Sequence, residues 1–185
     1  MDFRGLLNQV GTRQLRSRLV RCIPQLDFNA GDPPSYLFVS GRRNRCNPGG
    51  VECLYFSEDE ATADAEYREQ WAGTAAAHQP KLTFYAEARL ANVIDLGDSE
   101  ILKILNLMER EFSRPWRRAK KLTPLQRLGG AIASQSRISA IRYPSSAAQK
   151  YGFPGFNVVV FRTSMREPDS LRILGKTKKP LETWP

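Results

Sequence analysis

Apolar positions divide the chain into a series of short strands and helices. Runs rich in apolar and β-branched residues predict strands at 19–23, 36–39, 53–56, 82–90, 93–96, 138–143, 158–161 and 171–174. Pro24 ends the first of them. Phe84, Ala86 and Ala88 alternate along the 82–90 segment, so they are expected to share its buried face.

Four helices are predicted, the first over residues 3–10. The second begins after Ser57, with Glu60 completing a capping box, and continues to Trp71 before stopping at Gly73.

The other two predicted helices also begin at a capping residue. Asp98 caps one whose apolar stripe is predicted to pack in the core; the stripe consists of Ile101, Leu102, Leu105 and Met108. A capping box of Thr123 and Gln126, with proline at the first helical position, starts the other, which runs toward Ser134. Loops are expected at 29–34, 41–50 and 73–80, where Gly, Pro and polar residues gather.

Strands and helices follow one another without a regular β–α–β alternation. This order favours an α+β domain with a mixed or antiparallel sheet and flanking helices. The 185 residues suit one domain, with a core over about 18–174 and a loose C-terminal tail at 175–185.

The charge balance points to an anionic partner. The chain carries 28 Lys and Arg against 19 Asp and Glu, a net charge of +9. Nucleic acid, a phosphate-bearing small molecule or an acidic protein would each suit that charge. The basic segment 114–121 contains Trp116, so one alternative is a nucleic-acid-binding module. A solvated face or a contact with an acidic partner explains such a segment more often, and direct nucleic-acid binding is not expected.

Cysteine and histidine are scarce. Three cysteines indicate a reducing compartment rather than a disulfide framework, and the single histidine, His78, leaves no ligand set for a metal. The chain lacks a signal-peptide pattern and an apolar stretch of the roughly 18 residues that span a bilayer, which favours a cytoplasmic protein.

Familiar nucleotide-binding and hydrolytic motifs are absent. The sequence has no P-loop and no Gly-x-Gly-x-x-Gly turn. A Ser–His–Asp triad would need the single histidine. Instead, one loop–strand–helix unit carries Arg45, Tyr55 and Glu66, and the glutamate falls on an apolar-leaning part of its helix. Such a carboxylate lies either at the edge of the element or in a functional site.

Five motifs in order resemble the RES domain family, which is named for an arginine, a glutamate and a serine. They are Leu19-Val20-Arg21, the loop 41–47, Leu54-Tyr55 followed by Ala63 to Glu66, residues 141–145 ending in Pro144-Ser145, and Asn157 opening an apolar strand. The resemblance covers about 18–174.

The resemblance implies an ADP-ribosyltransferase-like fold with a pocket for NAD. Members of the family are bacterial toxins that consume NAD by hydrolysis or phosphorolysis, or that ADP-ribosylate a protein target. Their usual antitoxin is a neighbouring Xre-like helix-turn-helix protein that occludes the pocket. A secreted effector with the same chemistry is an alternative.

Within this resemblance, each motif residue has an expected role. Cleavage of the nicotinamide–ribose bond builds positive charge on the ribose, and Glu66 is expected to stabilise it. Arg21 and Arg45 suit the pyrophosphate, with Arg21 also counted as catalytic. Tyr55 offers its ring to the cationic nicotinamide. Ser145 is also expected to be catalytic, by hydrogen-bonding a ribose or the nicotinamide amide rather than as a nucleophile, and Asn157 is expected to orient the pocket. Each residue also has a purely structural alternative, as a surface, core or turn residue.

Overall fold

A computed structural model describes the chain except for residues 1, 30–40, 136, 175–179 and 185. The strand expected at 36–39 and residues 30–34 of the expected loop lie outside the described residues. Seven strands form one sheet in the order β1-β2-β5-β4-β3-β6-β7, and an additional β1–β3 pairing joins the first and fifth of them. Among these described strands β3 and β4 run parallel, and the other pairs are antiparallel.

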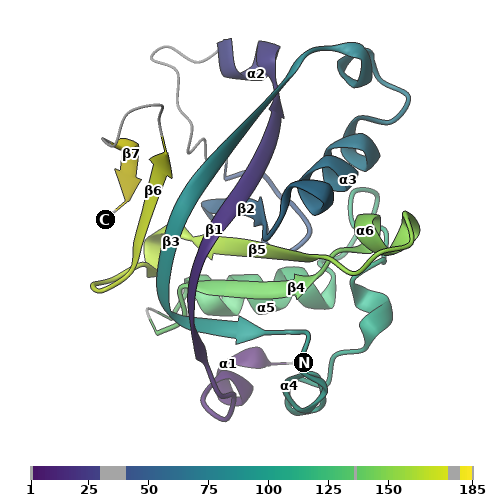
Figure 1. Ribbon diagram of the computed structural model, residues 1–185. Helices are drawn as coiled ribbons and strands as arrows, with labels where there is room; N and C mark the ends of the chain where they lie inside the picture. The colour runs from purple at the N-terminus through teal and green to yellow at the C-terminus, as the bar shows by residue number, and fades with distance from the viewer. Residues whose placement is uncertain (1, 30–40, 136, 175–179, 185) are drawn as a thin grey trace.

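The two longest strands cross the front of the molecule in Figure 1. They are β1 (Arg13–Pro24) and β3 (Lys81–Asp95), which pair along most of their length. We expected two strands at 82–90 and 93–96, but β3 is continuous. Its first part pairs with β1 and β6 (Ser170–Leu174), and its last residues turn to pair with β4 (Ala140–Pro144). The prediction divided β3 at Ala91 and Asn92, where the chain changes partners without leaving the sheet.

Apolar side chains form two core layers. One lies between β1, β3 and β6 on one side and β2 (Cys53–Ser57), β4 and β5 (Phe156–Phe161) on the other. The predicted face of β3 belongs to it, with Phe84, Ala86 and Ala88 all buried. The second layer lies on the opposite face of β2, β5 and β4, against α1 (Phe3–Leu7), α4 (Ser99–Ile104) and α5 (Pro124–Ala133). The expected α+β architecture with a mixed sheet and flanking helices is confirmed.

Helix α3 (Glu60–Trp71) is capped by Asp59 and not, as predicted, by Ser57. The Asp59 carboxylate accepts hydrogen bonds from the backbone N–H of Thr62 at 2.7 Å and from its hydroxyl at 2.8 Å. Ser57 is the last residue of β2, and its side chain is engaged elsewhere. The predicted stop is borne out, since Gly73 follows the helix with a φ of +71°.

Removing this cap is expected to lower stability. Asp59→Ala leaves the first turn of α3 without a side-chain acceptor, which typically costs about 1 kcal/mol. For a chain of this size, Tm should fall by about 2–4 °C. Asp59→Asn, which keeps a capping oxygen, is the matched control in a thermal unfolding experiment. If the alanine variant melts at the wild-type temperature, the cap contributes nothing to stability.

The remaining elements confirm several predictions and correct others. Asp98 caps α4 and the Thr123–Gln126 capping box starts α5, as expected. Helix α4 ends before Met108, which is 53% exposed and so does not extend the buried stripe. The C-terminal tail is not loose throughout, because β7 (Pro180–Trp184) pairs with β6.

Two short helices were not predicted. They are α2 (Gln25–Asn29), directly after β1, and α6 (Ser146–Lys150), directly after β4. Three 3₁₀ turns, Ala75–His78, Glu109–Glu111 and Arg162–Ser164, complete the described structure.

Candidate active site

The centre of the candidate site is the half-buried carboxylate of Glu66 on α3. The Ser145 hydroxyl donates to Glu66 Oε1 at 2.7 Å, and Asn157 Nδ2 donates to the same oxygen at 2.6 Å. No hydrogen bond to Oε2 is formed within the described part of the chain. One carboxylate oxygen is therefore held by two donors, and the other accepts no hydrogen bond from the described residues.

Three predicted site residues thus meet, although they are far apart in the sequence. Asn157 is the second residue of β5, where it pairs with Tyr143 of β4 and with Ser57 of β2. Ser145 follows β4 directly and caps α6, because its hydroxyl accepts the backbone N–H of Ala148. In Figure 1, the end of β4 and the start of β5 lie next to α3 and α6 at the right of the molecule.

Gly155 allows α3 and α6 to approach each other closely enough for these contacts. A Cβ at Gly155 would overlap Thr62 of α3 and lie 2.8 Å from Ala148 Cβ of α6. Its carbonyl also accepts the Ser145 N–H at 2.8 Å. The glycine therefore sets the distance across which Ser145 reaches Glu66.

Tyr55 supports the loop at 41–50. Its hydroxyl donates to Asn47 Oδ1 at 2.7 Å and accepts from the Cys46 backbone N–H at 3.0 Å. Asn47 in turn donates to three backbone carbonyls, those of Arg42, Pro48 and Val51. Burial raises the pKa of Tyr55 well above its usual value. The hydroxyl is thus a fixed structural link, and the contact expected between the ring and nicotinamide stays a prediction.

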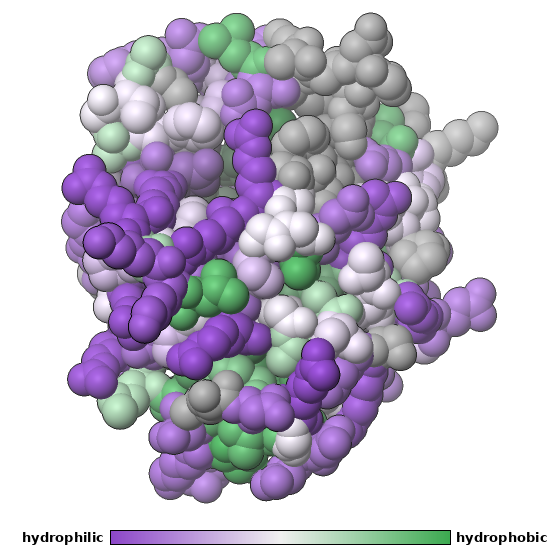
Figure 2. Space-filling model, turned by 180° about the vertical axis from the view of Figure 1, so that it is seen from behind, coloured by the Kyte–Doolittle hydropathy of each residue, from purple (hydrophilic) through white to green (hydrophobic). Residues whose placement is uncertain are grey.

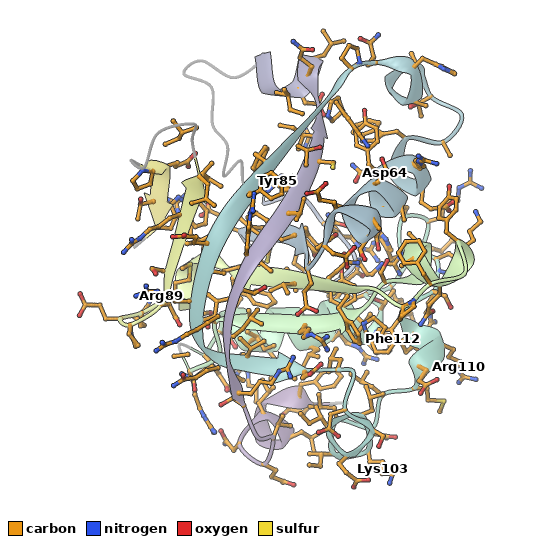
Figure 3. The ribbon with its side chains drawn as sticks, in the orientation of Figure 1. Asp64, Tyr85, Arg89, Lys103, Arg110 and Phe112 are labelled. Atoms are coloured by element: carbon orange, nitrogen blue, oxygen red, sulfur yellow. The ribbon has the colours of Figure 1, made fainter. Side chains whose placement is uncertain are left out.

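Two arginines of this loop hold the segment at 112–121. Arg45 Nη1 donates to the carbonyls of Phe112 and Arg114, and Arg43 donates to those of Ala119 and Lys121. We refer to this set of contacts as the arginine clasp. The Phe112 ring, labelled in Figure 3, stacks on Tyr143 with centroids 6.5 Å apart and planes at 25°. The clasp holds the segment 112–121 beside β4, the strand that ends just before Ser145.

The charges of Arg45 and Glu66 both act on the buried pair Tyr143 and Cys46. Burial raises the pKa of the Cys46 thiol to about 12 and that of Tyr143 well above its usual value. The charge of the arginine lowers both pKa values, and the charge of the glutamate raises both. Both charged residues thus lie near Cys46 and Tyr143, and the phosphate-binding role expected of Arg45 stays a prediction.

Arg21 lies on β1, opposite Phe84 of β3 in register. Its guanidinium is deeply buried, which lowers its pKa to about 10, and the charge of Glu182 on β7 partly offsets this effect. The residue as a whole is of intermediate exposure, so the burial concerns its guanidinium end. Its expected role at the pyrophosphate stays a prediction, separate from the hydrogen bonds around Glu66.

Sequence reasoning missed Ser57, Tyr143 and an ion-pair network next to the site. In this network Arg142 binds Glu58 and Asp95 at 2.7–3.2 Å and lies 3.3 Å from the centroid of the Phe156 ring. Arg13 binds Asp95 as well, at 2.9 Å. These residues look like ordinary strand-end polar positions, so only the fold identifies them.

Thiol labelling should separate the three cysteines. Burial raises the pKa of all three thiols, but Cys22 is half-exposed whereas Cys46 and Cys53 are buried. The thiolate is the reactive form and must be accessible to the reagent, so the folded protein should lose one thiol to an alkylating reagent well before the other two. Peptide mass spectrometry should place that label on Cys22, and unfolding in denaturant should release the other two. Fast labelling of Cys46 in the folded protein would contradict the burial described here.

The described residues include neither a cluster of three or more His, Cys, Asp or Glu side chains placed to bind a metal nor a helix able to span a membrane.

Two surface hollows lie away from Glu66. One has a volume of about 280 Å³ and lies between α1 and α5; the other, of about 440 Å³, lies beside α3 and includes Asp64. Figure 3 labels Asp64, which faces the upper ends of β1 and β3.

Comparison with known proteins identifies the family. A search of curated proteins finds no significant match. Among solved structures, the fold matches a chain of the crystal structure of the M. tuberculosis MbcT–MbcA toxin–antitoxin complex. The TM-score is 0.67 at 14% sequence identity, over 94% of this chain and 90% of that chain. The RES domain family model matches residues 18–181, nearly the whole length, so this chain belongs to the RES domain family.

Proposed function

We propose that this chain is the toxin of a toxin–antitoxin pair and that it breaks the nicotinamide–ribose bond of NAD. The carrying observation is the Glu66 carboxylate, with Oε1 held by Ser145 and Asn157 and Oε2 left for a ligand. Family membership and the likeness in fold to a toxin–antitoxin protein support the toxin role.

The proposed chemistry uses the negative charge of Glu66. The bond from ribose C1′ to the nicotinamide nitrogen breaks, and its electron pair leaves with neutral nicotinamide. Positive charge develops on C1′ and the ring oxygen, where a nearby carboxylate stabilises it or holds the ribose hydroxyls. The oxygen of water, of phosphate or of a protein side chain then bonds to C1′, and water or a side-chain hydroxyl releases a proton.

The basic residues would hold the rest of the substrate. Arg45 uses Nη1 for the clasp, which leaves Nε and Nη2 of the same planar group for phosphate oxygens. Arg21 would supply a second guanidinium. Ser145 would hydrogen-bond a ribose or the nicotinamide amide, and the Tyr55 ring would face the nicotinamide cation.

An antitoxin is the proposed protein partner, of the Xre-like type that the family resemblance implies. Figure 2, seen from behind, shows polar side chains over most of the visible face, with smaller apolar areas between them. Arg114, Arg117, Arg118 and Lys120 are exposed on the clasped segment. An acidic stretch of an antitoxin would complement this charge next to the active site.

The test is an NAD-consumption assay with chromatographic separation of products, in buffers with and without phosphate. We expect the wild type, free of antitoxin, to release nicotinamide and Glu66→Ala to be inactive. Glu69→Ala is the matched control, because Glu69 lies on the same helix and binds only Lys150 in the described structure. Phosphate dependence would identify phosphorolysis, and labelling of lysate proteins by tagged NAD would identify protein ADP-ribosylation. If NAD stays intact under all these conditions and no protein is labelled, the chain is not an NAD-consuming enzyme.

A further inference from the structure

Ser57 takes part in a second set of hydrogen bonds behind the catalytic carboxylate. Its hydroxyl donates to Asn157 Oδ1 at 2.8 Å, and Asn157 Nδ2 donates to Glu66 Oε1 at 2.6 Å. The contact crosses from the end of β2 to the start of β5, where Ser57 and Asn157 are register partners. The two hydrogen bonds therefore form a chain in which Ser57 donates to Asn157 and Asn157 donates to Glu66.

The direction matters because an asparagine amide has two different ends. With Nδ2 toward Glu66, the amide donates to the carboxylate; turned by 180°, it would place a carbonyl oxygen against a negative charge. In the observed orientation Oδ1 points away from Glu66 and needs a donor. Ser57 supplies that donor.

Burial makes this donor difficult to replace. Ser57 and Asn157 are each only 4% exposed, so water has little access to Oδ1. A buried acceptor that loses its donor is costly, and the amide would turn or shift to find another partner. The hydrogen bond that Ser57 donates to Oδ1 also polarises the Asn157 amide, which strengthens the hydrogen bond from Nδ2 to the Glu66 carboxylate.

We propose that Ser57 is a positioning residue of the NAD-cleaving reaction, acting through Asn157 to aim the Glu66 carboxylate at the ribose. This inference rests on the function proposed above. Ser57 is nearly inaccessible, so it does not contact the substrate. Its effect belongs to the chemical step rather than to NAD binding, because Arg21 and Arg45, on other elements, are assigned to the phosphates.

The test compares Ser57→Thr with Ser57→Val. The two side chains have nearly the same shape, and only threonine keeps the hydroxyl, so any shared defect comes from the extra volume. Ser57→Val should lower kcat by about 10- to 100-fold, the range for a small misplacement of a catalytic group, with KM for NAD changing far less. Ser57→Thr should restore most of the lost rate. Thermal unfolding of both variants shows whether they fold.

A double-mutant cycle supplies the second measurement. In an Asn157→Ala background, Ser57→Ala should have little further effect on kcat, because the path from Ser57 to Glu66 is already broken. Equal rates for wild type and Ser57→Val overturn this inference alone, as do fully additive effects in the cycle. Equally slow threonine and valine variants also overturn it. A wild-type protein that leaves NAD intact overturns the proposed function, and this inference falls with it.

Discussion

Glu66→Gln is expected to slow NAD consumption by about 10²–10³-fold while leaving the fold nearly as stable as the wild type. The glutamine oxygen can still accept hydrogen bonds from Ser145 and Asn157, so the local structure is kept. The negative charge is lost, and an amide N–H₂ takes the place of Oε2. Removing one electrostatic contribution to a charged transition state typically costs a factor of about 10²–10³ in rate. The variant should therefore release nicotinamide at a much lower initial rate than the wild type, while its Tm changes little.

Glu66→Ala provides the comparison that isolates the charge. It removes the acceptor as well, which leaves the Ser145 hydroxyl and the Asn157 amide without their partner. We expect this variant to be inactive and also less stable than Glu66→Gln, by about 1–3 kcal/mol. If Glu66→Gln keeps half of the wild-type rate or more, charge at this position is not what drives the reaction.

Gly129→Ala should be among the most damaging substitutions outside the Glu66 network. A Cβ on Gly129 of α5 would overlap the Cys46 carbonyl oxygen and lie 2.8 Å from the carbonyl carbon. Both atoms are backbone, so neither can swing aside as a flexible side chain would. Overpacking usually costs about 1–3 kcal/mol, and a clash between a helix and a fixed loop belongs at or above the upper end. The Cys46 N–H also binds Tyr55, so displacement of the loop should loosen the arginine clasp.

Gly130→Ala, at the next position of the same helix, is the matched control. Its Cβ would lie 3.3 Å from Pro48 Cγ, a tight contact with one side chain. The higher helix propensity of alanine, worth about 1 kcal/mol, should offset much of that crowding. Denaturant unfolding should therefore show a large loss for Gly129→Ala and a change of under about 1 kcal/mol for Gly130→Ala. Similar losses for the two variants would mean that the approach of α5 to Cys46 is not a critical contact.

The starts of α4 and α5 were predicted well, because the cap of each lies next to it in the sequence. Asp98 and the Thr123 capping box act within three residues of their helices, so the sequence contains the whole interaction. At α3 two candidates, Ser57 and Asp59, stand two residues apart. Asp59 is the cap because the Ser57 side chain is already hydrogen-bonded to Asn157, which lies 100 residues further along the chain. A local pattern cannot include that competitor.

The members of the site were predicted better than their arrangement. The order of motifs pointed to Glu66, Ser145 and Asn157, and the fold brings these three together. Which atom bonds to which depends on the register of β2, β5 and β4 and on the close approach at Gly155. The same motifs pointed to Tyr55 and Arg45 as ligands of the substrate, whereas their described contacts also build the loop at 41–50. A motif marks a constrained position without telling a substrate contact from an internal one.

The arginine clasp has a consequence for how this protein can diversify. Arg43 and Arg45 hold the 112–121 segment by its carbonyl oxygens, which every amino acid possesses. The exposed side chains at 114, 117, 118 and 120 take no part in the clasp. Substitutions at these positions can therefore change the surface of the segment while its backbone stays in place. On the proposed function, a new cognate antitoxin could be matched by surface substitutions alone, with the hydrogen bonds around Glu66 unchanged.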